Sequence, residues 1–189
     1  GLAGIFAVTG ALALGGAAVV LWIVPPEPAR HADQPTGRLV DVLRHGPTLR
    51  LNFTVFVLHA VLVAMWVAVP ALLVDAGLPK NHHWWVYLPA ITGSFLVMGG
   101  VLFPLERRGH LKPVFLAALG LLAIVQVALA LVASGTPSLA WLAVLLFLFF
   151  CGSNILEASQ PSIASRAAPP GARGAALGFY NTLMSFGFF

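Results

Sequence analysis

The chain has 189 residues, of which 59% are hydrophobic and only 8% are charged. Soluble domains carry about 25% charged residues, so this composition excludes a soluble protein and predicts an all-α membrane protein that contacts the lipid bilayer. The formal net charge of +4 could suggest nucleic acid as a partner, but the distribution of the basic residues supplies another explanation.

Lys and Arg are concentrated in every second connection between the apolar runs. Successive connections carry four, one, three, none and two of them, in residues 25–50, 75–83, 106–112, 134–138 and 165–173. Helices that cross a membrane back and forth produce this alternation when the basic connections stay cytoplasmic. Topology therefore explains the positive charge, and the sequence predicts no nucleic-acid partner.

Six uncharged runs provide the predicted transmembrane segments: residues 2–24, 51–74, 84–105, 113–133, 139–156 and 174–189. Most are close to the ~20 residues that a helix needs to cross a bilayer, and unbroken runs exclude an outer-membrane barrel. Because the first and last runs contain the chain ends, we expect a piece of a longer polypeptide. Residues 37–45 suit either a short amphipathic helix at the membrane surface or a solvated linker.

Glu157 is a carboxylate in the helix predicted to begin near residue 139. Helical spacing places it on one face with Ser153, Asn154 and Gln160, and a polar face on a membrane helix must contact protein or a water-filled cavity. Two interpretations remain open: a structural ion pair or cap, and a relay for protons or substrate. His59 leaves a similar choice, between a proton shuttle and a hydrogen bond to a neighbouring helix.

The sequence lacks the motifs that would indicate an enzyme with a bound cofactor or metal. It contains no phosphate-binding loop of the G-x-x-x-x-G-K-[ST] type, no H-E-x-x-H and no G-x-S-x-G. Cys151 is the only cysteine, which excludes an internal disulfide and a thiolate metal cage. We therefore expect no enzymatic activity, no cofactor and no metal site.

The stretch "PLERRGHLKPVF" resembles the signature loop of the major facilitator superfamily, G-x-x-x-D-R-x-G-R-[RK]. Glu106 takes the acidic place, Arg107 the basic place and Gly109 the turn, whereas Leu102 replaces the leading glycine and His110 the next basic residue. Four further stretches resemble, in order and spacing, the YajR branch of proton-linked, drug-efflux-type facilitators: "LWIVPPEP", "LRLNFTVFVLHAVLVAMWVAVPALLVDAGLP", "HHWWVYLP" and "NILEASQPSIASRAAPPGARGAALGFYNT".

This resemblance implies a partial helical bundle of the major facilitator type, with six transmembrane segments of an expected twelve. Residues 1–24 would be the last helix of the N-terminal half (TM6), residues 25–50 the cytoplasmic linker between the halves, and residues 51–189 the C-terminal half, from TM7 to a truncated TM11. The missing N-terminal half of the same polypeptide would be its partner. Glu157 would join Arg166, or basic residues of the missing half, in a charge network at the cytoplasmic gate.

The function implied by the resemblance is secondary transport by a multi-pass protein of a bacterial inner (plasma) membrane. We expect export of a small amphiphilic molecule against proton entry, by rocking of two bundles about a midplane site. Proton coupling or gating would fall to Glu157, His59 and Arg166. The alternative is a non-transporting membrane sensor or assembly protein that retains the bundle. The residues expected to line the substrate cavity are Met65, Trp66, Gln126, Asn154, Tyr180 and Asn181.

Overall fold

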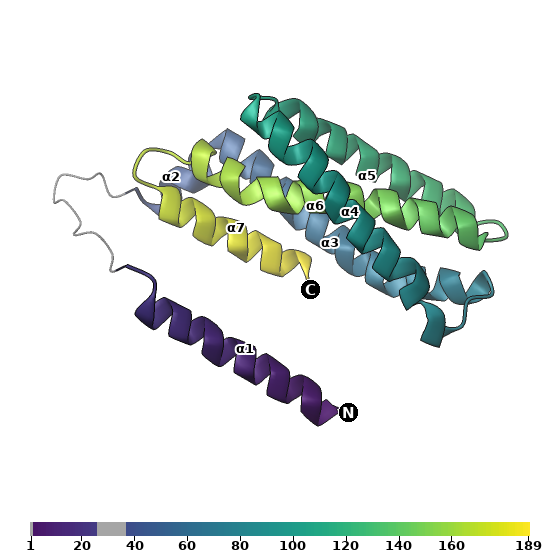
Figure 1. Cartoon of the computed structure of the whole chain (residues 1–189). Helices are drawn as coiled ribbons and strands as arrows, with labels where there is room; N and C mark the ends of the chain where they lie inside the picture. The colour runs from purple at the N-terminus through teal and green to yellow at the C-terminus, as the bar shows by residue number, and fades with distance from the viewer. Residues whose placement is uncertain (1, 26–36) are drawn as a thin grey trace. The chain divides into compact units, whose positions relative to one another are not determined.

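The computed structural model describes residues 2–25 and 37–189, and in these residues it contains helices and no strand. The first part of the predicted linker, residues 26–36, lies outside the described residues. The fold class is therefore all-α, as the composition predicts (Figure 1). The helices are α1 (Leu2–Trp22), α2 (Leu39–Arg44), α3 (Gly46–Asp75), the 3₁₀ helix Lys80–His82, α4 (Trp84–Arg107), α5 (Leu111–Ala133), α6 (Leu139–Ala167) and α7 (Arg173–Gly187).

Within residues 2–25 and 37–189, five helices are long and apolar enough to cross a membrane, namely α1, α3, α4, α5 and α6. This confirms five of the six predicted segments by length and composition. The last predicted segment forms α7, which has 15 residues and is shorter than the ~20 that a crossing needs.

The chain divides into two compact units, residues 1–34 and residues 35–189. Helix α1 belongs to the first unit and exposes apolar side chains on all sides, for example Phe6, Leu14 and Trp22. A helix that is hydrophobic all round suits an environment of lipid or of other helices.

The second unit is a bundle in which α6 is the central helix (Figure 1). Helix α6 packs against α3, α4, α5 and α7, and α3 packs in addition against α7. The side chains of Leu142, Leu146, Phe149 and Leu156 on α6 are at most 1% exposed. Because lipid tails are as apolar as this core, close packing rather than the hydrophobic effect must hold such helices together.

Helix α2 packs on the start of α7. The Asp41 carboxylate accepts a hydrogen bond from the Arg38 backbone N–H at 2.8 Å and so caps the helix N-terminus. Val42 is fully buried against Ala172 and Ala176. Residues 39–44 of the predicted linker are therefore a docked helix, whereas a location of this helix at the membrane surface remains a prediction.

Candidate functional site

Glu157 projects from α6 well inside a membrane-spanning helix. It lies about 15 Å from the end of α6 at Ala167, at ~1.5 Å per residue, and its side chain is exposed on the surface of the second unit. Within the described residues, the Glu157 carboxylate forms no ion pair, and the ion pair present there joins Arg166 and Glu106. A carboxylate at this depth must contact protein or water rather than lipid. The face of α6 that carries Glu157 is therefore a candidate functional surface.

Two ionisable side chains from neighbouring helices accompany Glu157. His59 on α3 and Tyr180 on α7 each lie within electrostatic range of the Glu157 carboxylate. Tyr180 is buried in a cluster with Leu51 and Val55. Three different helices thus place an acid, an imidazole and a phenol in one region, which makes this region a candidate site.

His59 is 3% exposed because the end of α7 covers it. The ring of Phe188 packs edge-on against the imidazole, with 4.7 Å between centroids, and a Cβ at Gly187 would lie 2.7 Å from the His59 Cβ. His59 Nδ1 lies 2.8 Å from the carbonyl oxygen of Val55, so Nδ1 carries the hydrogen of the neutral ring and Nε2 is the atom that can accept a proton. The hydrogen bond of His59 is made within its own helix.

Arg166 pairs with Glu106 rather than with Glu157. Arg166 Nη2 donates to Glu106 Oε1 at 2.9 Å, which joins the end of α6 to the end of α4. Arg166 follows Glu157 by nine residues, about 13 Å along the helix at ~1.5 Å per residue, so the two side chains lie at different depths. The charge network expected between Glu157 and Arg166 is therefore not formed within this chain.

The signature-loop residues lie where α4 turns into α5. Gly109 adopts φ of 79°, a left-handed conformation that strains residues with a Cβ. The Gly109 N–H bonds the Glu106 carbonyl at 2.9 Å and the His110 N–H bonds the Leu105 carbonyl at 2.8 Å, which is the Schellman pattern of helix ends. Arg107 stands in the last turn of α4, where a cation complements the helix dipole.

The Glu106–Arg166 pair should contribute little to stability. The two side chains are 27% and 65% exposed, and pairs open to solvent are worth about 0.2–1 kcal/mol. We expect a double-mutant cycle with Glu106→Gln and Arg166→Gln to give a coupling free energy below about 1 kcal/mol. The measurement is thermal melting of the full-length protein in detergent, and a coupling above about 2 kcal/mol would mean that the pair is shielded from solvent.

An aromatic cluster lies two helical turns away from Glu157 and His59. Trp66 on α3 stacks on Tyr87 of α4, with 5.2 Å between centroids and 16° between planes, and Phe150 of α6 lies 6.4 Å from both. Trp66 follows His59 by seven residues on α3, and Phe150 precedes Glu157 by seven residues on α6. Each pair therefore shares a face of its helix. Trp66 is 55% exposed, so the cluster offers an open aromatic surface.

Tyr87 and Phe150 were not predicted from the sequence as members of this cluster. Tyr87 follows Trp84 and Trp85, a pattern typical of an interfacial belt, and nothing local distinguishes it from them. The available signal was the seven-residue spacing between Phe150 and Glu157 on one helix face.

Asn154 joins α6 to α4 in this structure. Its Nδ2 donates to Ser94 Oγ at 2.7 Å, and the Ser94 hydroxyl donates to the carbonyl oxygen of Ile91 at 2.7 Å. A contact of Asn154 with substrate would require this hydrogen bond to open, and it stays a prediction.

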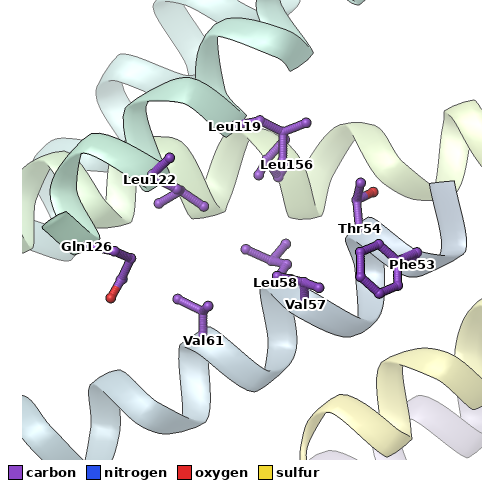
Figure 2. A pocket seen from close by; sticks show the side chains of 10 residues that line it. Phe53, Thr54, Val57, Leu58, Val61, Leu119, Leu122, Gln126 and Leu156 are labelled. Atoms are coloured by element: carbon purple, nitrogen blue, oxygen red, sulfur yellow. The ribbon is translucent and has the colours of Figure 1, made fainter. Parts of the chain in front are cut away.

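An apolar cavity of about 290 Å³ lies between α3, α5 and α6 (Figure 2). Figure 2 shows Val57, Leu58 and Val61 on one side, and Leu119, Leu122 and Leu156 on the other. Gln126 lines this cavity and also a second one, of about 200 Å³, together with Met65. Gln126 Nε2 is buried without a hydrogen-bond partner among the described residues.

The six residues predicted to line a substrate cavity thus fall in separate places. Met65 and Gln126 border the space between α3 and α5, Trp66 belongs to the aromatic cluster, and Asn154 lies between α4 and α6. Tyr180 is buried near Glu157, whereas Asn181 is exposed on α7. The structure therefore does not assemble all six around one cavity, and their roles in binding remain predictions.

These helices, with a polar face inside the spans and a basic turn between α4 and α5, define a polytopic helical membrane protein. The sequence model of the Major Facilitator Superfamily matches residues 1–189, the whole chain. The chain therefore belongs to the major facilitator superfamily.

Two curated proteins resemble the chain. It is 32% identical to the inner membrane transport protein YajR of Escherichia coli (strain K12) over 192 residues, which cover 99% of this chain and 41% of that protein. It is 26% identical to the uncharacterized transporter BU466 of Buchnera aphidicola subsp. Acyrthosiphon pisum (strain APS) over 140 residues, which cover 74% of this chain and 35% of that protein. The chain spans less than half the length of these relatives.

Proposed function

We propose that the full-length protein is a secondary active transporter that exports a small amphiphilic molecule in exchange for protons. The observation that carries this proposal is Glu157, an exposed carboxylate inside a membrane span with His59 and Tyr180 in electrostatic range. The open aromatic surface around Trp66 would bind the apolar part of a substrate. The carboxylate would bind either a proton or the polar head of the substrate, which couples the two.

The proposed organisation follows the superfamily membership. Residues 1–24 would end the N-terminal half, residues 25–50 would link the halves in the cytoplasm, and residues 51–189 would belong to the C-terminal half. In such an arrangement the surface with Glu157 faces the other half, so the carboxylate is kept from lipid. The resemblance to an inner membrane transport protein supports a location in a bacterial inner membrane.

The second candidate function is that of a sensor or assembly protein that kept the bundle and lost the transport cycle. The hydrogen bond between Asn154 and Ser94 and the burial of His59 favour it, because both side chains are engaged in packing. It predicts that no substrate moves at all.

Transport by the full-length protein in liposomes separates the two functions. Ethidium, an amphiphilic fluorescent cation, serves as the probe, and an acidic lumen supplies the proton gradient. We expect the gradient to accelerate ethidium uptake at least about tenfold over protein-free liposomes, with release of luminal protons, and nigericin to abolish the acceleration. Absence of both dye and proton movement, repeated with berberine as a second amphiphilic cation, would contradict transport and support the sensor.

A further inference from the structure

Two buried amide side chains, one on α3 and one on α6, have atoms that no protein group in the described part of the chain satisfies. Asn52 is 1% and Gln160 0% exposed, and Asn52 Oδ1, Gln160 Oε1 and Gln160 Nε2 have no hydrogen-bond partner among the described residues. Buried polar atoms are nearly always hydrogen-bonded, because leaving them unpaired is costly. The unpaired atoms of the two amides therefore indicate that a small polar molecule binds to them.

The two amides lie at nearly the same depth. The Thr48 hydroxyl donates to the Ala167 carbonyl oxygen at 3.3 Å, which aligns the start of α3 with the end of α6. From this contact Asn52 lies about 6 Å along α3 and Gln160 about 10 Å along α6, at ~1.5 Å per residue. Thr48 contacts Ala167 of α6, and Ala164 lies in a buried cluster with Leu51 and Val55 of α3. Asn52 shares its helix face with Thr48 and Gln160 shares its face with Ala164, so we infer that both amides lie on the faces that α3 and α6 turn to each other.

The amides also connect Glu157 to the end of the bundle. Side chains tilt toward the N-terminus of their helix, so in this antiparallel pair Gln160 leans toward Glu157 and Asn52 toward Thr48. Asn52 Nδ2 donates to the Thr48 carbonyl oxygen at 2.8 Å, and Thr48 Oγ1 lies 2.8 Å from His45 Nδ1. His45 is partly exposed. Polar side chains thus occur at intervals between Glu157 and His45 at the end of the bundle, with the unpaired atoms of Gln160 and Asn52 among them.

We propose that Gln160 and Asn52 hold a short file of water molecules that carries protons between Glu157 and the cytoplasmic end of the bundle. The proposal deepens the proton coupling proposed above and rests on it. Water suits the site because a buried water needs two to four polar partners, and the unpaired amide atoms can donate and accept.

Proton movement along this file needs no co-reactant. A proton passes from the carboxyl oxygen of Glu157 to the first water, which releases one of its own protons to the next water, and the last water releases a proton to bulk solvent. Gln160 and Asn52 only donate and accept hydrogen bonds, so their protonation does not change. Entry of a proton reverses these steps.

The other ionisable groups around the file lie at its ends or on its border. His59 accompanies Glu157, and Tyr180 on α7 belongs to the same buried cluster as Ala164. The Glu106–Arg166 pair lies at the cytoplasmic ends of α4 and α6. None of these groups replaces the hydrogen bonds that the two amides lack.

The rate of proton exchange at Glu157 tests the proposed file of water molecules directly. In Gln160→Met and Asn52→Leu variants of the full-length protein in liposomes, we expect this exchange to slow at least about tenfold. The readout is the carbonyl stretch of protonated Glu157 in infrared difference spectra after a pH jump, identified by its loss in Glu157→Gln. Ser159→Ala is the matched control, because this buried hydroxyl already donates to the Leu156 carbonyl at 3.2 Å, and its exchange rate should stay unchanged.

A conservative variant keeps the test valid if the apolar variants do not fold. Gln160→Asn keeps the amide donor and acceptor on a side chain one methylene shorter, so exchange should stay within about threefold of wild type. Unchanged exchange in Gln160→Met and Asn52→Leu would overturn the proposal, as would slow exchange in Gln160→Asn or in Ser159→Ala.

The proposed transport function can fail independently of the file. A wild-type protein that exchanges protons at Glu157 with the expected dependence on Gln160, yet moves neither ethidium nor berberine, would contradict transport and leave the file in place. Transport that depends on a sodium gradient and is insensitive to these variants would overturn the file.

Discussion

Replacing Gly152 by leucine is expected to separate α5 from α6 and to destabilise the bundle on the order of 3 kcal/mol. A Cβ at Gly152 would lie 2.9 Å from Leu122 Cδ2, 3.0 Å from its Cγ and 3.4 Å from the carbonyl oxygen of Ala118. The leucine branch cannot be placed without moving α5, because α6 is also packed against α3, α4 and α7. The loss of stability is measured as a lower melting temperature of the full-length protein in detergent.

Gly120→Leu is the matched control for this prediction. Gly120 lies in α5, but a Cβ at this position meets nothing within 4 Å, and leucine has a better helix propensity than glycine by up to about 1 kcal/mol. We expect the melting temperature of Gly120→Leu to stay the same or to rise. Equal stability of the two variants would contradict the close approach of α5 and α6.

Glu157→Gln is expected to reduce proton-driven ethidium transport at least about 100-fold, the lower range of the effect of losing a proton-transfer group. Glutamine keeps the size and polarity of the side chain but cannot take up or release a proton. Because Glu157 is exposed and makes no ion pair within the described residues, its replacement removes no contact of the bundle. The melting temperature should therefore stay within about 2 °C of the parent.

Asp75→Asn is the matched control for Glu157→Gln, since it also replaces an exposed carboxylate with its amide. Asp75 is the last residue of α3, where its charge can be solvated, so we expect unchanged transport. Unchanged transport in Glu157→Gln would exclude Glu157 as the proton carrier, and His59→Gln would then be the variant to measure. Loss of transport together with a lower melting temperature would indicate a structural role.

The sequence alone determined that this is a membrane protein, where its long helices lie, and which superfamily it belongs to. Long apolar runs are local properties, so six membrane spans were predicted without any knowledge of their neighbours, and five of them are long and apolar enough to cross a membrane in the described residues. The match of the whole chain to the superfamily agrees with the motif around Glu106. The turn at Gly109 was also predictable, because the positive φ observed there is a demand of the local backbone. Periodicity also predicted one polar face of α6 with Ser153, Asn154, Glu157 and Gln160, but in the structure Glu157 is exposed whereas Ser153 and Gln160 are buried.

Only the tertiary structure decided which polar side chains meet. Arg166 pairs with Glu106, and Asn154 is bound to Ser94. The amides of Asn52 and Gln160 lie buried without partners. Helical spacing tells which residues share a face of one helix, but the partner of that face depends on how the apolar side chains of several helices fit together. That fit involves residues distant in sequence, and no local pattern records it.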